Sequence, residues 1–250
     1  MQPTRGGGQL GPRSPLPCSW DRPFASVGKG AVPAAWKQAA WAELAATVRG
    51  LHYATVLLDL VKAFERIPYW FLVQQAGKYG YNLALLRLSI AAYRLGRAVG
   101  VVGVFSRVLV AARGITAGSV FVTIEMRLVM IEALDCATSC CRCVRLTCYV
   151  DDVGVEMTST AMEIERRLPQ VTLAFTRPLE RVGLEFSASK NSVTASCGTL
   201  AGRLEAKLER LRVRRRDRVK SLGTGLGVGR RRNAQVGKRR LEAFKRRRIR

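Results

Sequence analysis

Residues 144–157 read VRLTCYVDDVGVEM, and this stretch fixes the fold that the sequence predicts. Alternating apolar residues lead up to Tyr149 and resume at Val153, which is typical of two strands, 142–148 and 153–157, joined by a tight turn. Asp151 and Asp152 fall at the tip of this hairpin. Adjacent carboxylates repel unless a cation lies between them, and a divalent metal ion is the obvious candidate. A solvated turn is the alternative interpretation.

A third acid lies at the end of an apolar run. Residues 54–60 read ATVLLDL, a buried strand in which Asp59 is the one charged side chain. A lone carboxylate there costs several kcal/mol unless it is paired or bound to metal. A solvent-facing acid at a strand edge is the alternative interpretation of Asp59. Phe64, five residues further on, can be interpreted separately as a core residue where the strand meets a helix.

Four segments occur in one order along the chain: LLDLVKAFERIP (57–68), RGITAGSV (113–120), YVDD (149–152) and GLEFSASKNSV (183–193). They resemble, in order, four motifs of the reverse transcriptase palm, in a style closer to non-LTR retrotransposon and group II intron enzymes than to retroviral ones. The resemblance covers roughly residues 24–197. It implies an α+β fold, with a ferredoxin-like antiparallel sheet and helices on one face.

The resemblance also implies an activity, RNA-directed DNA polymerisation by two-metal nucleotidyl transfer. Asp59 and Asp151 would bridge two Mg²⁺ (or Mn²⁺) ions, with Asp152 more peripheral. Lys190 would protonate the leaving pyrophosphate, unless it is simply a solvated turn lysine. The partners implied are an RNA template, a DNA primer and a dNTP; no oligomeric state is predicted.

Nucleotide-binding positions follow from the same resemblance. Phe64 matches the aromatic ring that lies under the incoming sugar and excludes a 2′-hydroxyl. Gly114 and Gly118 would let the backbone approach nucleotide and template. Arg113 would contact phosphate or face solvent.

The chain departs from the family pattern in three places. Thr116 and Ala117 replace the usual Pro-Gln pair of the second motif. Few residues precede Asp59, so that 24–30 would be the last remnant of the fingers, and no thumb is recognisable. We therefore expect a truncated element of a retroelement polyprotein, with weak or no extension by this chain alone. The alternative is an inactive relic that at most binds nucleic acid through its basic residues; a ribosomal-type RNA-binding protein would leave the four motifs unexplained.

Charge divides the chain into three regions. The 250 residues carry a net charge of +24, and residues 199–250 hold 20 Lys and Arg against 4 acids. We expect a disordered segment at 1–23, a palm with finger remnant at 24–198, and a basic helical or disordered tail at 199–250. The tail predicts nucleic-acid contact or nuclear import, with a solvated extension as the alternative. No signal peptide or membrane span is predicted, so a nuclear or cytoplasmic protein with reduced cysteines is expected.

Other elements follow from periodicity. Helices are expected at 33–49, 83–95, 117–134 and 160–181, the last broken before Pro169 and Pro178, and short strands within 99–112, at 184–186 and at 192–195. Cys136, Cys140, Cys141 and Cys143 lack the paired spacing of structural zinc sites, so reduced, packed thiols are favoured over zinc. His52, the single histidine, is expected to be structural.

Overall fold

The centre of the fold is a five-stranded sheet with strand order β4–β5–β1–β6–β7. The structure, a computed structural model, describes residues 31–48, 50–221 and 224–227; the segments predicted at 1–23 and 24–30 and the last part of the tail, 228–250, lie outside these residues. The strands are β1 (His52–Asp59), β4 (Arg145–Tyr149), β5 (Asp152–Ser159), β6 (Ser192–Ala195) and β7 (Arg214–Arg215). The first four pair antiparallel, and β7 joins β6 in parallel.

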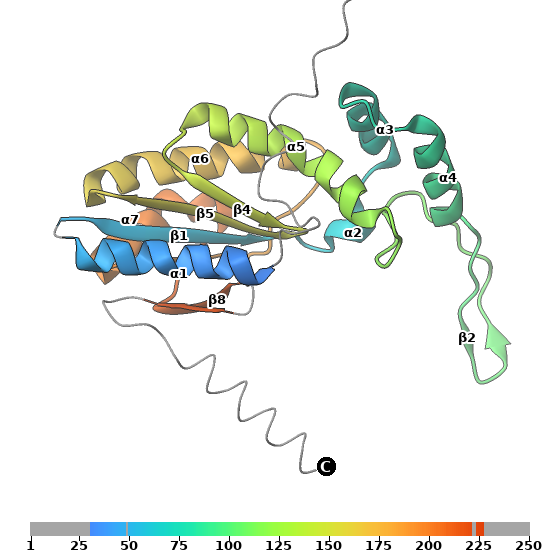
Figure 1. The fold of residues 1–250 in the computed structure, drawn as a ribbon. Coiled ribbons are helices and arrows are strands. Elements are labelled where there is room, and N and C mark those ends of the chain that lie inside the picture. Colours follow the sequence, from blue (N-terminus) through green and yellow to red (C-terminus); the bar gives the residue numbers. More distant parts are fainter. Residues whose placement is uncertain (1–30, 49, 222–223, 228–250) are drawn as a thin grey trace, which may run out of the picture.

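Helices cover both faces of this sheet (Figure 1). Three of them, α5 (Val122–Cys140), α6 (Ala161–Arg181) and α7 (Gly198–Lys207), pack on one face. On the other face lie α1 (Ala31–Thr47) and the hairpin of β8 (Arg218–Ser221) and β9 (Thr224–Gly227). The mixed architecture agrees with an α+β class, but the expectation of helices on one face only is wrong, because α1 buries the second face.

The alternation of β1 explains the two layers. Ala54, Val56 and Leu58 are buried on one side of the strand and belong to the core that α5 and α6 close. Tyr53 and Thr55 are buried on the other side, the one that faces α1. A strand buried on both sides reads as a continuous apolar run, as residues 54–60 do.

Helix α6 runs unbroken through both of its prolines, contrary to the predicted breaks. Pro169 removes the N–H that would have bonded to the carbonyl of Glu165. Lys207, on α7, donates its Nζ to that same carbonyl at 3.4 Å. Tertiary packing therefore supplies the donor that the helix lacks, which no local pattern could reveal.

The chain between β1 and α5 forms an arm that extends away from the sheet (Figure 1). It contains α2 (Ala63–Arg66), α3 (Tyr69–Lys78), α4 (Leu83–Tyr93) and the short hairpin of β2 (Gly100–Val101) and β3 (Val104–Phe105). The hairpin turns at Val102 and Gly103, both with positive φ, rather than at the predicted Phe105–Ser106. Helix α5 begins at Val122, later than predicted, because residues 116–119 form a turn.

The expected domain boundary after residue 198 falls at the first residue of α7, and the packed body continues beyond it. Leu200, Leu204 and Leu208 are buried, followed by a 3-10 helix (Glu209–Leu211) that leads into β7. The segment predicted as a strand at 184–186 contributes a single bridge, Leu60 to Phe186. Among the described residues, no helix is long and apolar enough to cross a bilayer.

Candidate active site

Two carboxylates face each other where β1 and β5 meet at the end of the sheet. The register pairs Asp59 directly with Asp152. Directly opposed residues of antiparallel strands have Cα atoms about 4.5–5.5 Å apart, and like charges in such a pair are destabilising. The sequence expectation gave Asp151 the central place beside Asp59; the register shows that Asp152 is the residue opposite it.

Asp151 lies in the two-residue loop that joins β4 to β5. The other loop residue, Val150, has φ of 61°, while Asp151 is not among the residues with positive φ. A positive φ at the first loop position alone is the pattern of a type II′ turn, which is normally led by glycine. A β-branched residue there costs on the order of 1–3 kcal/mol, a cost typical of functional sites.

Lys190 is the cation that pairs with Asp59. Its Nζ lies 3.0 Å from one carboxylate oxygen of Asp59 and 3.2 Å from the other. The hydrogen bond to Asp59, the charge of Asp59 and the charges of Asp151 and Asp152 raise the pKa of Lys190, although some desolvation opposes them. Lys190 is therefore a charged ammonium group held against Asp59.

Asp152 has no such ion-pair partner among the residues that the structure describes. Desolvation, then the charge of Asp151, then that of Asp59 raise the pKa of the Asp152 carboxyl, and Lys190 only partly offsets them. A carboxylate whose pKa is raised by two neighbouring acids is stabilised by any cation that enters between them.

Asn191 holds the backbone around Asp59 and was missed by the sequence reasoning. Its buried side chain accepts a hydrogen bond from the Asp59 N–H at 3.1 Å and donates to the carbonyl of Leu211 at 3.0 Å. The Asp59 carbonyl in turn accepts from the N–H of Ser187 at 2.8 Å. The only available signal was an amide residue directly after Lys190 at the start of an apolar strand.

A cleft of about 310 Å³ opens beside the acids. Asp59, Asp152 and Lys190 line it, together with Arg216, which follows β7, and Arg218, the first residue of β8. Neither arginine was singled out in the sequence, because both lie in the region expected to be a tail. The cleft thus has acids at the sheet end and cations around them.

The second motif docks on the element that follows the first. The N–H of Gly114 bonds to the carbonyl of Ile67 at 2.8 Å, and that of Ile115 bonds to the carbonyl of Phe64 at 2.7 Å. A Cβ at Gly114 would lie 2.9 Å from the Glu65 carbonyl oxygen, and its φ is +98°, so this close approach requires glycine.

The other predicted nucleotide-binding residues are not among the described residues that line the acid cleft. Phe64 is partly buried against the core and, within the described chain, is not among the residues that line the acid cleft. Gly118 has φ of +95° in an open turn, and Arg113 is exposed. The structure therefore groups Asp59, Asp152 and Lys190, with Asp151 adjacent, and groups Phe64 with Gly114.

The acids fit a divalent cation in chemistry, with a limited set of ligands. Carboxylate oxygens are the donors that Mg²⁺ prefers, and the repulsion that raises the pKa of Asp152 is what a cation would relieve. Within residues 31–48, 50–221 and 224–227, however, no three His, Cys, Asp or Glu side chains are arranged to hold a metal ion as they stand. The fit is to the opposed pair, Asp59 and Asp152.

A second acid on β5 was also missed. Glu156 is buried on the face covered by α1, where Gln38 donates a hydrogen bond to it. Burial raises the pKa of Glu156 to about 7, although Gln38, Arg145, Thr147 and Tyr53 all act to lower it. The sequence contained a signal for this residue, an acid inside the apolar strand predicted at 153–157.

Comparisons with known proteins give a weak structural likeness and no match to a family or a curated sequence. The chain matches no protein-family model and no curated protein. Among solved structures it matches telomerase from Candida albicans, determined in complex with the TWJ fragment of telomeric RNA, at 12% identity and a TM-score of 0.49. The match covers 86% of this chain and 35% of that one, so the chain spans about a third of the telomerase.

Proposed function

We propose that this chain is a reverse-transcriptase-type palm that transfers nucleotides from a dNTP to a DNA primer on an RNA template. The observation that supports the proposal best is the opposed pair Asp59 and Asp152, with Asp151 in the adjoining turn and Lys190 on Asp59. Three acids and a lysine that are far apart in sequence gather at one end of the sheet, on the motifs that resemble the palm.

The reaction would join the primer 3′-oxygen to the α-phosphorus of the dNTP and release pyrophosphate. A divalent cation, Mg²⁺ or Mn²⁺, would supply charge neutralisation for the attacking and leaving oxygens when it is bound between the carboxylates. Asp59 and Asp152 would hold it, and Asp151 would add a carboxylate from the turn. Lys190 would deliver a proton to the pyrophosphate oxygen as the P–O bond breaks.

The remaining residues would position the substrate. Phe64 and Gly114 pack against each other's segments, so the element after Asp59 and the second motif would act as one surface under the nucleotide. Arg216 and Arg218, which line the same cleft as the acids, add positive charge where polyphosphate would enter.

Primer extension tests this proposal. The full chain is incubated with a homopolymer RNA template, a complementary DNA primer, the matching dNTP and Mg²⁺ or Mn²⁺. We expect weak extension that Asp59→Asn and Asp152→Asn abolish. Glu156→Gln is the matched control, because it changes an acid of the same strand outside the predicted site.

The second candidate is a catalytically inactive relic that binds nucleic acid. Ala117 in the second motif and the lack of a ready three-ligand group among the described residues favour it. The relic would bind RNA through its basic residues, with an affinity that falls steeply as salt rises, because binding releases counterions. Filter binding at several salt concentrations, with and without residues 228–250, tests this: salt-independent binding, or binding unchanged by the deletion, would refute it. Extension that depends on Asp59 would exclude the relic.

A further inference from the structure

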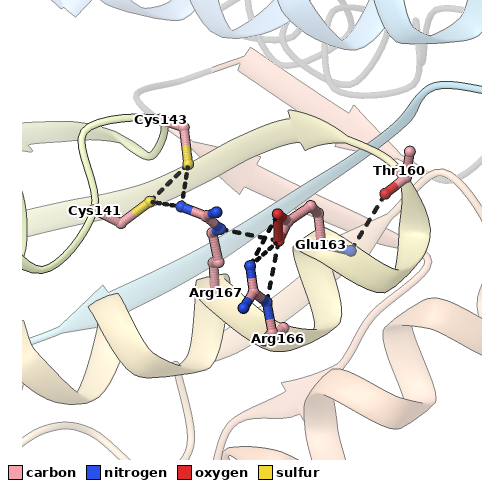
Figure 2. Close-up of polar contacts among 6 residues, drawn as sticks. All are labelled: Cys141, Cys143, Thr160, Glu163, Arg166 and Arg167. Carbon is pink, nitrogen blue, oxygen red and sulfur yellow. Dashed lines mark hydrogen bonds and ion pairs between the residues drawn. The ribbon is translucent and has the colours of Figure 1, made fainter.

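Two thiols meet where α5 ends and β4 begins (Figure 2). The sulfurs of Cys141 and Cys143 lie 2.6 Å apart, about 0.6 Å more than a disulfide bond. Both cysteines are free; Cys141 is buried and Cys143 is exposed. One sulfur is therefore shielded while its neighbour is open to solvent.

An arginine from α6 is held against this pair. The Nε of Arg167 donates to Glu163 at 2.9 Å, which leaves Nη1 directed at the Cys141 sulfur at 3.4 Å, with the Cys143 sulfur at 3.9 Å (Figure 2). Glu163 is itself fixed at the start of the helix, where its N–H bonds to the Thr160 hydroxyl at 3.4 Å. The guanidinium is thus oriented by a carboxylate on one side and faces sulfur on the other.

This environment shifts the pKa values of the two thiols in opposite directions. Burial raises the pKa of Cys141, but hydrogen bonds from Cys143 and Arg167 outweigh it, so the pKa of Cys141 is lowered overall. Burial and then the interaction with Cys141 raise the pKa of Cys143. Cys148, which is buried without a cation, has a pKa raised to about 12 by burial and by Asp151 and Asp152. Of the two sulfurs, Cys141 is therefore the one that loses its proton more readily.

We propose that Cys141 and Cys143 form a redox-active dithiol, with Cys141 as the attacking thiolate, Cys143 as the resolving thiol and a peroxide as the oxidant. A stabilised thiolate beside a second cysteine is the arrangement found in cysteines that sense oxidants. A hydroperoxide is small enough to reach a sulfur that is nearly covered. This site is independent of the proposed function, because Cys141 and Cys143 lie before the first residue of β4, whereas Asp151 lies after its last residue.

The chemistry needs no other reactant. The Cys141 thiolate attacks one peroxide oxygen, the O–O bond breaks, and the departing hydroxide takes a proton to become water, which leaves a sulfenic acid on Cys141. The Cys143 sulfur then attacks the Cys141 sulfur, the S–O bond breaks, and the hydroxide leaves as water with the Cys143 proton. The product is the disulfide, which a thiol reductant returns to two thiols.

Mass spectrometry of the oxidised protein tests the pairing. Cys136→Ser with Cys140→Ser removes the neighbouring exposed thiols, and this variant is treated with hydrogen peroxide and then blocked with iodoacetamide. Trypsin cuts after Arg142, so a Cys141–Cys143 disulfide joins the peptide that ends at Arg142 to the tripeptide 143–145. We expect this linked species, and its loss on reduction. If both thiols are instead recovered alkylated, the proposal is wrong.

A matched pair of variants tests the role of Arg167. Arg167→Gln and Arg166→Gln each remove an arginine that binds Glu163, but only Arg167 contacts the sulfurs. We expect the rate of Cys141 alkylation near pH 7 to fall about three- to tenfold in Arg167→Gln, as the thiolate fraction drops, and to stay unchanged in Arg166→Gln. Equal rates in the two variants would overturn the assignment.

A third variant keeps the test decisive if Arg167→Gln fails to fold. Cys143→Ser removes the resolving thiol, so peroxide should stop at the sulfenic acid of Cys141. Dimedone should then label Cys141, and should leave Cys148 unlabelled in the same sample. Labelling of Cys148 but not Cys141 would contradict the proposal.

Discussion

Strand β5 carries two acids, Asp152 and Glu156, that lie four residues apart on the same face. Each faces a residue of β1: Asp152 faces a second acid, Asp59, and Glu156 faces Thr55. Glu156 is buried among hydrogen-bonding groups from α1, β1 and β4, and Arg145, which lowers its pKa, is itself stacked 4.1 Å from the ring of Trp41. Asp152 is exposed at the end of the sheet, where Lys190 is bound to Asp59.

The difference shows how one strand separates structure from function. In the middle of the sheet the surroundings satisfy an acid with hydrogen bonds, or let it keep its proton, and it then helps to fasten α1 to the sheet. At the end of the sheet, two acids lie opposite each other beside a cleft, and Lys190 is bound to Asp59 rather than to Asp152. Uncompensated charge of this kind is typical of sites that bind a cation.

The largest expected effect is on metal binding and activity, both of which should depend on Asp152 and not on Glu156. Asp59→Asn or Asp152→Asn should lower primer extension at least about a hundredfold, since several kcal/mol of charge stabilisation depend on the cation they hold. Both should also weaken Mn²⁺ binding measured by electron paramagnetic resonance, whereas Glu156→Gln should change neither. Loss of Mn²⁺ binding in Glu156→Gln alone would reverse the comparison.

Glu156 should instead control how stability depends on pH. Its pKa rises from 4.5 in the unfolded chain to about 7 in the folded one. The folded chain therefore holds a proton that the unfolded chain releases, so stability falls as pH rises from about 4.5 to about 7. Glu156→Gln should remove this fall and stabilise the protein by up to about 3 kcal/mol at pH 8.

Urea unfolding at pH 5 and pH 8 measures this effect. Wild type and Glu156→Gln should have similar unfolding free energies at pH 5 and differ at pH 8. Thr158→Ser is a mild control on the same strand. Parallel pH profiles for wild type and Glu156→Gln would show that Glu156 is ionised in the folded protein throughout.

Lys190 sharpens the comparison at the acid end. Because Lys190 neutralises Asp59, it competes with a metal ion for that carboxylate. Lys190→Met should therefore raise Mn²⁺ affinity a few-fold, while extension falls through loss of the proton donor. Stability should change little, since the Lys190 side chain is largely exposed. A fall in both Mn²⁺ affinity and extension would mean that Lys190 organises the site rather than acting in it.

The smallest effect concerns the turn. Val150→Gly removes the cost of a β-branched residue at φ of 61°, but adds chain entropy to the unfolded state, so we expect a net stabilisation of about 0.5–1 kcal/mol by urea unfolding. By contrast, Val155→Ala, in the buried part of β5, should destabilise the protein. A destabilised Val150→Gly would show that packing of the Val150 side chain outweighs the strain.

Local patterns were sufficient for much of the fold. The apolar run at 54–60 and the alternation around Asp151 predicted β1 and the β4–β5 hairpin, because the periods of buried strands are recorded in neighbouring residues. Helices α1 and α4 were expected within a few residues of where they lie. The breaks in α6 were predicted wrongly, because the donor to Glu165 comes from Lys207, a residue 42 positions away in sequence.

The sequence by itself singled out the residues that the proposed function needs: Asp59, Asp151, Asp152 and Lys190 were distinguished by residue type, by spacing and by resemblance to known motifs. Only the tertiary structure decided which of them meet. Strand register placed Asp152 rather than Asp151 opposite Asp59, and Asn191 proved to fix the backbone of Asp59. Tertiary packing also placed Arg167 against Cys141 and buried Glu156 under α1. These contacts join residues far apart in the chain, and long-range pairing is set by the packing of whole elements, which leaves no periodic trace in the local sequence.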